Sequence, residues 1–319
     1  MAVLVGIDEA GFGPILGPLV VSSTTFKLPS ELLRADLWQV LQRTVAYSRR
    51  HPSGRLLITD SKKAHSPSSG IRHLERTTLS MLSVLGYKPA SLEGLLSQLD
   101  ATCLPRLKAY AWYTRLAEHG LPSHDPDIAV AAHALSQDMA RNNMAFLGIE
   151  SRCLDVGYYN ERVKTVRNKS NVLFSITCTL LKTAWDLHQT ADFQVVIDRQ
   201  GGRVHYSDSL LRMFPGMSLT ILRENERISS YVLSDAGRQI RVHFAVKADT
   251  RCLPVSLASM VSKYLRELMM QQINNYFVDR CPELKRTAGY WQDGLRFIQD
   301  LERHIPDKTS DKDRLIRCR

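Results

Sequence analysis

Short apolar runs alternate with longer segments of helical periodicity along this chain. Residues 2–7 and 193–197 are apolar and rich in β-branched side chains, which is typical of buried strands. Residues 171–188 repeat an apolar side chain every four positions, which predicts an amphipathic helix. The same reasoning predicts further strands and helices, the strands at 19–26, 56–58, 228–233 and 239–246 and the helices at 31–47, 71–85 and 256–276.

This order of elements predicts an α/β fold, with a mixed central β-sheet flanked by helices and a C-terminal helical segment. A glycine- and proline-rich turn at 11–18 predicts that the first two strands form a hairpin, and Ser234–Gly237 predicts a second one. We find no internal repeat and no low-complexity linker. We therefore expect one catalytic domain over residues 1–306, followed by a polar, frayed tail at 307–319.

Composition narrows the class of protein. Of 319 residues, 44% are hydrophobic and 23% charged, as in ordinary soluble domains. The net charge of +10 suits a polyanionic partner such as nucleic acid, although a basic, solvated surface gives the same total. The six cysteines include no C-x-x-C pair, so neither a zinc site nor a disulfide framework is predicted. We expect no secretory leader and no membrane span, and hence a cytoplasmic location.

Four carboxylates stand at the ends of three predicted strands. Asp8 and Glu9 follow the first strand, Asp198 ends the strand at 193–197, and Asp249 follows a third. Ligand sites in open α/β sheets collect at strand ends. Adjacent strand residues point to opposite faces, so Asp8 and Glu9 share a site only where the strand ends or twists. The alternative is that each acid is a polar cap of its own strand.

Clustered carboxylates repel one another and resist ionising together. A divalent cation removes that conflict, and Mg²⁺ prefers oxygen ligands while keeping places for water and phosphate. Two such ions roughly 4 Å apart can activate a water and stabilise the leaving oxygen of a phosphodiester. The acids are therefore candidate ligands of Mg²⁺ or Mn²⁺, with two ions expected when substrate is bound.

Several short motifs resemble those of one known family. The string GIDEAGFGP at residues 6–14, followed by GPLVV at 17–21, resembles the opening motif of type 2 ribonucleases H (ribonucleases HII and HIII). The later motifs resemble this family in the same order: DSKK at 60–63, NVL at 171–173, VID at 196–198, KAD at 247–249, ASMVSK at 258–263, RE at 266–267 and GY at 289–290.

The resemblance implies a ribonuclease H-like fold and a metal-dependent endoribonuclease. Such an enzyme cleaves on the 5′ side of ribonucleotides, in RNA–DNA hybrids or in duplex DNA with embedded ribonucleotides, and leaves 5′-phosphate and 3′-OH ends. It implies no organic cofactor and no membrane partner, and we expect a monomer. The catalytic and metal-binding residues it implies are Asp8, Glu9, Asp198 and Asp249.

The resemblance also implies a set of substrate contacts. Lys62 and Lys63 are expected at phosphates beside the scissile bond, because lysine is a compact charge. Tyr290 is expected to stack on the sugar next to the ribonucleotide. The backbone of Gly11 and Gly13 is expected at the ribose 2′-OH, which is the group that distinguishes RNA from DNA.

The chain departs from the family pattern at several places. Phe12 stands between the two glycines, where the family usually has a basic residue, so a phenyl ring replaces a phosphate-binding cation. We interpret Phe12 as a candidate substrate contact that stacks on a base or sugar; the alternative is that its ring fills a gap. Two segments, about 89–150 and about 222–246, are longer than the family leads us to expect and are interpreted as insertions. The second carries arginines that either touch a duplex backbone or guard a solvated hairpin edge, namely Arg223, Arg227, Arg238 and Arg241.

Two other functions compete with the nuclease hypothesis. Glycines 11, 13 and 17 faintly resemble a dinucleotide-binding fingerprint, but the third glycine is one place late and a strand follows where a helix is required. The second alternative is a catalytically weak or inactive nucleic-acid-binding homologue, with altered substrate because of Phe12. A basic residue introduced at position 12 distinguishes it from an active enzyme.

Overall fold

A seven-stranded mixed sheet forms the centre of the molecule, in the order β5-β2-β1-β6-β9-β8-β7. The computed structural model describes residues 1–50, 53–66, 69–188, 192–304 and 312–318. Strand β1 pairs antiparallel with β2 and parallel with β6, which in turn pairs parallel with β9. The strands of this sheet are β1 (Ala2–Ala10), β2 (Leu19–Leu28), β5 (Ala145–Leu154), β6 (Asp192–Asp198), β7 (Ser218–Glu224), β8 (Ile228–Asp235) and β9 (Arg238–Ala245).

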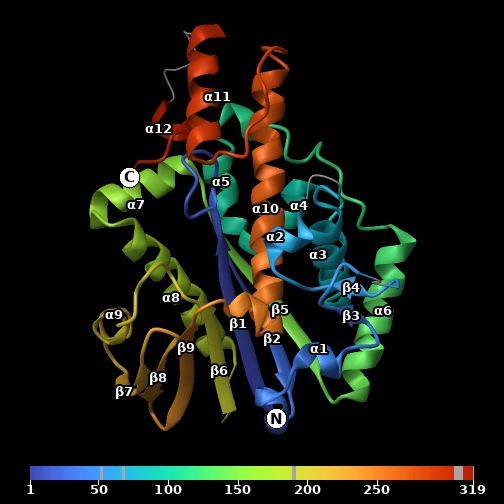
Figure 1. Ribbon diagram of the computed structural model, residues 1–319, viewed down its shortest axis with the longest axis vertical. Helices are drawn as coiled ribbons and strands as arrows, with labels where there is room; N and C mark the ends of the chain where they lie inside the picture. The colour runs from blue at the N-terminus through green and yellow to red at the C-terminus, as the bar shows by residue number, and fades with distance from the viewer. Residues whose placement is uncertain (51–52, 67–68, 189–191, 305–311, 319) are drawn as a thin grey trace.

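Helices surround this sheet, and two short strands, β3 (Val45–Ala46) and β4 (Leu56–Leu57), form a small separate pair (Figure 1). The α-helices are α1 (Leu37–Val40), α2 (Ser61–Ala64), α3 (Arg72–Val84), α4 (Leu92–Asp100), α5 (Leu104–Leu107), α6 (Pro126–Arg141), α7 (Val156–Val166), α8 (Lys169–Leu187), α9 (Ser207–Met213), α10 (Leu253–Val278), α11 (Trp291–His304) and α12 (Lys312–Leu315). The described residues also form four 3-10 helices: η1 (Ser30–Arg34), η2 (Ala101–Cys103), η3 (Ala111–Tyr113) and η4 (Ala248–Thr250).

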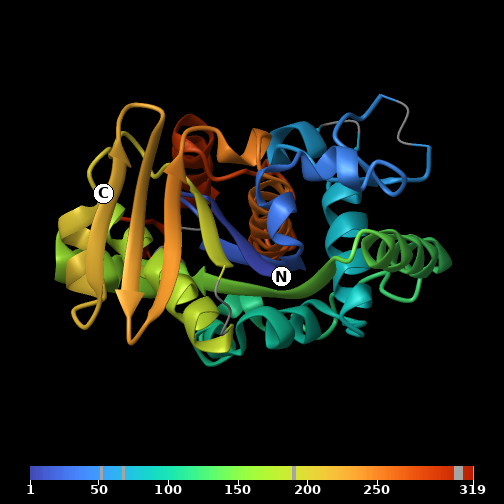
Figure 2. The same ribbon diagram turned by 90° about the horizontal axis from the view of Figure 1, so that it is seen from below.

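The sheet separates two apolar cores, because alternate residues of β1 face opposite sides. Leu4 packs into a core under α10, which lies along β1 and β2 and is the long central helix of Figure 1. Val5 packs into a second core under α8, on the opposite face. Figure 2 shows the molecule from below, with β7, β8 and β9 side by side at one end of the sheet. Strand β1 is thus apolar on both faces, as its unbroken apolar run predicts.

Helix α10 approaches β1 more closely than a side chain would allow. A Cβ built at Gly6 would lie 2.2 Å from the backbone carbonyl carbon of Pro254, in the first turn of α10. Only glycine therefore permits this contact. It fixes the height of α10 along β1, and so determines which helix residues lie level with Asp8.

The predicted fold class is confirmed, and most predicted elements are present at close to the expected positions. The continuous helix predicted over 31–47 is wrong. That segment breaks into η1, α1 and β3, because the Asp36 carboxylate accepts a hydrogen bond from Trp38 N–H and starts a new helix there. Strand β1 also runs past the predicted end at Ile7, as far as Ala10.

The predicted frayed tail is also wrong for its described part, residues 312–318; residues 307–311 of that prediction lie outside the described residues. Arg317 is only 4% exposed, and Ile316 forms a β-bridge with Leu16. The backbone N–H of Arg317 donates to the carbonyl oxygen of Ile15 at 2.8 Å. These bonds dock the segment on the glycine-rich turn. No helix among the described residues is both long and apolar enough to cross a membrane.

Candidate active site

Asp8 and Glu9 lie where β1 extends beyond its neighbour β6. The parallel pairing of the two strands ends at Ile7 and Ile197, while β1 continues along β2 to Ala10. One step further in the same register places Asp8 level with Asp198, the last residue of β6. The two carboxylates therefore meet at the point where β6 stops.

Neighbouring side chains hold Asp8 on the face of the sheet covered by α10. Asp8 is buried, and the side chain of Ser259 from α10 forms a hydrogen bond with it. Ser262, one turn further along the helix, donates to the Asp8 carbonyl oxygen at 3.1 Å. The backbone N–H of Glu9 donates to Asp8 Oδ1 at 2.8 Å. Asp8 is thus oriented by its own strand and by α10 together.

A tight turn after β9 brings Asp249 close to Asp198 at the end of β6. Lys247 adopts a left-handed conformation, with φ of 55°, which turns the chain into η4. The N–H of Ala248 then donates to Asp198 Oδ1 at 2.7 Å. This bond ties the end of β6 to the segment that carries Asp249. Both carboxylates are half-buried.

The pKa values show that the four acids act on one another. Burial, followed by the charges of Asp198 and Asp249, raises the pKa of Glu9 to about 8. Burial, followed by Glu9 and Asp198, raises the pKa of Asp8. Burial and Asp249 raise the pKa of Asp198 to about 6. The sequence motifs are therefore assembled into one site with an excess of negative charge.

A divalent cation fits the chemistry of this site. Its donors are carboxylate oxygens, which Mg²⁺ and Mn²⁺ prefer, and their raised pKa values reflect charge that a cation would balance. Their oxygens are spread more widely than a single-ion cage. Among the described residues, the only group of three or more His, Cys, Asp or Glu whose ligand atoms all lie within 4.8 Å of one another is Asp100, Cys103 and Cys153.

That second group is part of the packing beneath β5. One Asp100 oxygen accepts from Thr102, and the other accepts from the backbone N–H of Cys153 at 2.7 Å. The carboxylate is thus satisfied as a hydrogen-bonding link between η2 and β5, and none of the predicted site residues belongs to this group.

Helix α2 brings the two predicted lysines to the edge of the site. Asp60 caps the helix by accepting a hydrogen bond from Lys62 N–H at 2.9 Å, and Lys62 and Lys63 are exposed. Both cations lower the pKa of Asp249, against the larger effects of burial and of Asp60. Ser61 is linked to Ser259 of α10 at 3.0 Å. The same serine therefore contacts both Asp8 and α2.

The glycine-rich turn and Tyr290 are also brought together. Gly11 has a φ of +93°, and a Cβ there would lie 2.6 Å from Nε of Arg266, so a side chain is excluded on both grounds. The carbonyl oxygen of Gly289 accepts from Ile15 N–H at 2.8 Å, which docks the Gly-Tyr element on this turn. Tyr290 is 48% exposed, with the Arg266 guanidinium 5.7 Å from its ring centre.

Arg317 holds this turn from beneath and was missed by sequence reasoning. Its Nε donates to the carbonyl oxygen of Gly17 at 2.7 Å, and its Nη1 donates to that of Gly11. The guanidinium lies 4.8 Å from the ring centre of Tyr159. Burial, and then the nearby Arg266, lower the pKa of Arg317 to about 9. A polar segment far along the sequence gives no sign of this contact.

Phe12 packs at the rim of the second core, where it is half-buried. Lys169, the first residue of α8, places its Nζ 5.3 Å from the Phe12 ring centre. A cation therefore stands next to position 12, although it comes from another element. Phe12 and Lys169 are 157 positions apart in the sequence, and no pattern around Lys169 predicts the contact.

The arginines of the 222–246 segment are not equivalent. Arg238 donates to the carbonyl oxygens of Trp185 and His188, and lies 4.1 Å from the Trp185 ring centre. It thus closes the end of α8. Arg223, Arg227 and Arg241 are exposed on the β7–β9 side of the sheet.

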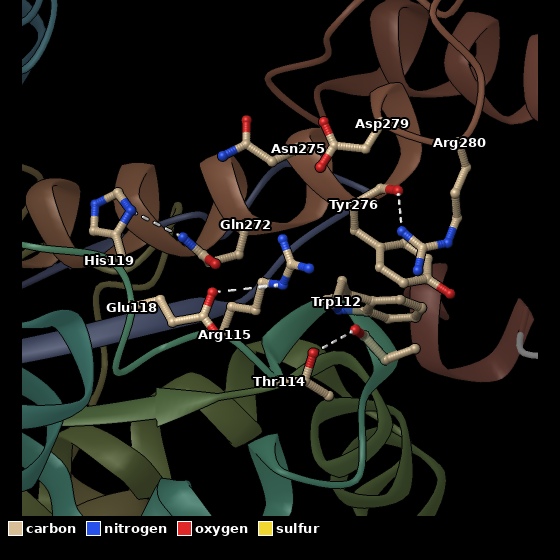
Figure 3. Close-up of a pocket in the computed structure, with 11 residues that line it drawn as sticks. Trp112, Thr114, Arg115, Glu118, His119, Gln272, Asn275, Tyr276, Asp279 and Arg280 are labelled. Atoms are coloured by element: carbon tan, nitrogen blue, oxygen red, sulfur yellow. Dashed lines mark hydrogen bonds and ion pairs between the residues drawn. The ribbon is translucent and has the colours of Figure 1, made fainter.

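A different concavity, of about 440 Å³, lies between the second half of α10 and residues 111–119 (Figure 3). Two pairs of its polar side chains interact with one another: Gln272 with His119 at 3.1 Å, and Arg115 with Glu118 at 3.6 Å. None of the predicted site residues lines it.

Comparison with solved structures finds type 2 ribonucleases H. RNase HII of Archaeoglobus fulgidus, in a complex with PCNA, is 14% identical, with a TM-score of 0.40 over 93% of this chain and 87% of that one. Ribonuclease H2 of Pyrococcus horikoshii is 13% identical, with a TM-score of 0.41 over 98% and 97%. Bst-RNase HIII in complex with Mn²⁺ is 16% identical, with a TM-score of 0.42 over 99% and 66%.

Comparison with protein-family models finds no match, and comparison with curated proteins finds none either. At identities of 12–16% and TM-scores of 0.40–0.44, these likenesses assign no residue a role. The proteins named are type 2 ribonucleases H, the family that the sequence motifs resemble.

Proposed function

We propose that this protein is a metal-dependent endoribonuclease that cleaves on the 5′ side of ribonucleotides in duplex nucleic acid. Its substrates would be RNA–DNA hybrids or duplex DNA with embedded ribonucleotides, and its products 5′-phosphate and 3′-OH ends. The observation that supports the proposal is the meeting of four mutually repelling carboxylates beside two exposed lysines, namely Asp8, Glu9, Asp198 and Asp249 beside Lys62 and Lys63.

In this proposal the chain's own residues prepare the site for a phosphodiester. The four carboxylates would hold divalent ions, which when bound would supply Lewis acidity and a water of lowered pKa. Ser259 and the Ala248 N–H fix the orientation of Asp8 and Asp198. Lys62 attracts the phosphate, because it is exposed at the edge of the acidic cluster. No side-chain nucleophile is required, so no covalent intermediate forms.

Recognition of RNA belongs in this proposal to the glycine-rich turn. The backbone of Gly11 and Gly13 would approach the ribose 2′-OH, and at Gly13 an added Cβ would meet no atom within 4 Å, so the turn is open there. The exposed ring of Tyr290 would stack on the neighbouring sugar. The Gly289 carbonyl oxygen, which accepts from Ile15 N–H, holds the two parts together, and Arg317 fixes the turn itself.

The second candidate is a nucleic-acid-binding protein without cleavage, which Phe12 favours. The nearby Nζ of Lys169 weakens this alternative, because it returns a cation to that part of the site. Phe12→Arg separates the two candidates. If the natural chain is inert with Mg²⁺ and Mn²⁺ while Phe12→Arg cleaves, the second candidate is correct.

The direct test is cleavage of two labelled duplexes, one with a single embedded ribonucleotide and one an RNA–DNA hybrid, with Mg²⁺ or Mn²⁺. We expect cleavage 5′ of a ribonucleotide, and loss of at least about 1,000-fold in Asp8→Asn and Asp198→Asn. Equal activity in these variants and in the natural chain would contradict the carboxylate assignment.

A further inference from the structure

A second concavity, of about 400 Å³, opens beside the candidate active site, on the side of the small β3–β4 pair. We call it the basic concavity. Its lining residues come from the segment after β3 and from the start of α2: Tyr47, Ser48, Arg49, Arg50, Thr59, Lys62 and Lys63. The two lysines thus belong both to this concavity and to the edge of the carboxylate site.

The charge of the basic concavity has one sign. Four of its seven lining residues are cations and none is acidic. Arg49, Arg50, Lys62 and Lys63 are all exposed. The Nη1 of Arg49 donates to the carbonyl oxygen of Lys63 at 3.3 Å, which joins the two segments that form the walls. Several cations in one place suit several phosphates in a row more than a single anion.

The positive surface continues onto α3. Burial, followed by Arg49, Arg72 and Arg76, lowers the pKa of His73, so these guanidiniums share one region with Arg49. On α3 the charge of Arg76 is balanced by Asp127, with which it forms an ion pair. The walls of the basic concavity contain no acidic residue and are therefore more strongly cationic than this part of α3.

An aromatic ring and an unsatisfied hydroxyl add to the lining. Tyr47 is 37% exposed, its ring 5.5 Å from the Nζ of Lys63 and edge-on to Trp38 at 5.2 Å. Thr59 is 1% exposed, and its hydroxyl has no hydrogen-bond partner among the described residues. An aromatic ring among cations is a platform for a sugar or a base.

The basic concavity and the carboxylates are joined through α2. Lys62 and Lys63 lower the pKa of Asp249, so they lie within electrostatic reach of it. Ser61 contacts Ser259, which contacts Asp8. A nucleic-acid strand whose scissile phosphate lies at the carboxylates therefore has its next phosphates in reach of this surface.

We propose that the basic concavity binds the sugar-phosphate backbone of the nucleic-acid strand that flanks the cleaved bond. Arg49 and Arg50 bind successive phosphates, for which the guanidinium fork is suited, and Tyr47 packs against a sugar or base between them. This inference rests on the proposed function, since it extends the same substrate path. It assigns the segment after β3, for which the sequence motifs predict no role, to substrate binding.

Fluorescence anisotropy tests the proposal in EDTA, where cleavage cannot occur. The probe is a labelled 20-base-pair DNA duplex with one central ribonucleotide, titrated at several salt concentrations. For Arg49→Ala/Arg50→Ala we expect about 10-fold weaker binding and a log–log salt slope smaller by about two, one for each lost phosphate contact. For Arg49→Lys/Arg50→Lys we expect the same salt slope as for the natural chain, because lysine keeps the positive charge.

The matched control is Lys27→Ala/Arg141→Ala, which removes the same charge. Both control residues are exposed, and they lie near the pairing of Lys27 with Ala145, at the opposite end of the sheet from Asp8. We expect an unchanged salt slope. Equal loss in the two double variants would overturn the proposal, because it would show that net charge alone was measured.

Tyr47 provides a second, uncharged readout. Tyr47→Ala is expected to weaken binding about 5- to 10-fold, while Tyr47→Phe, which keeps the ring, binds as the natural chain does. Unchanged binding in Tyr47→Ala overturns the stacking role. Cleavage with Mg²⁺ tests the proposed function separately: a chain that cleaves normally but whose binding ignores Arg49 and Arg50 refutes only the inference.

Discussion

The carboxylate cluster and the basic concavity are both next to α2 and differ in how the fold builds them. The acids come from β1, β6 and η4, are wholly or half buried, and have raised pKa values. The cations come from one stretch, residues 49–63, and are exposed. Buried charge costs stability unless it is neutralised, while exposed charge costs little and is screened by salt. The first region should therefore determine the reaction rate, and the second the affinity.

The largest effect should separate rate from affinity. Asp198→Asn removes the charge of a proposed metal ligand and is expected to lower cleavage about 1,000-fold, without weakening duplex binding in EDTA. Lys63→Ala is expected to raise the Kd about 3- to 10-fold, with less than a 10-fold change in the rate at saturation. Single-turnover kinetics and anisotropy measure the two quantities. Weaker duplex binding by Asp198→Asn would contradict the assignment of rate to the carboxylates and of affinity to the basic concavity.

The next effect tests whether the turn held by Arg317 acts with the carboxylates. Arg317→Ala removes the donors to Gly11 and Gly17, and is expected to lower cleavage of a ribonucleotide-containing duplex about 30-fold. Because the same turn would read the 2′-OH, preference for ribonucleotide-containing over all-DNA duplex in binding should also fall. Arg303→Ala, an exposed change on α11, is the control. A variant with the preference intact would assign Arg317 to stability alone.

The third effect concerns stability in the absence of metal. Glu9 has a pKa of about 8 in the folded chain against 4.5 as the ordinary value, so the folded state binds its proton more tightly. Stability therefore rises as pH falls from about 8.5 towards 5, opposite to the usual behaviour of a paired acid. In EDTA the Tm at pH 6 should exceed that at pH 8.5.

Glu9→Gln should accordingly stabilise the metal-free chain at pH 8.5 by about 1 to 2 kcal/mol, or roughly 2 to 4 °C in Tm. Added Mg²⁺ should reverse the order, because the natural chain then binds the ion with one more carboxylate than the variant does. Glu31→Gln, an exposed change in η1, is the control. A lower Tm in metal-free Glu9→Gln would show that the repulsion is not present.

The smallest effect belongs to the cation beside position 12. Lys169→Ala is expected to weaken duplex binding about 3- to 5-fold and to reduce the salt slope by about one. Lys182→Ala, at an exposed position further along α8, should leave the slope unchanged. If Lys169→Ala also leaves it unchanged, the cation near Phe12 does not contact phosphate.

The sequence predicted the elements whose packing follows a simple period. Strands β1, β2 and β6 and helix α8 bury apolar residues at regular positions, so the sequence pattern alone identifies them. Strand β5 was not predicted, because a bulge opposite Thr25 and Phe26 interrupts its alternation. Its edge position also leaves part of it exposed.

The residues of the candidate site were predicted from short motifs, whereas the contacts that hold them in place were not. Its acids and lysines stand in short motifs, so their residue types could be assigned from the sequence. The groups that orient these residues could not be predicted, because their contacts are set by tertiary packing. They are Ser259, the Ala248 N–H and Arg317. The role of each proposed ligand and substrate contact, and the limits of the two inserted segments, remain predictions.

Strand β1 pairs with a strand that follows it by 190 positions, since Ile7 lies opposite Ile197. Closing so long a loop is slow, because its chain entropy is lost before the pairing energy is gained. The carboxylate cluster needs that closure, and η4 must then dock against β6 as well. Activity should therefore appear late in refolding, after the β1–β2 hairpin and the isolated helices have formed, and partly folded chains should be unable to cleave nucleic acid.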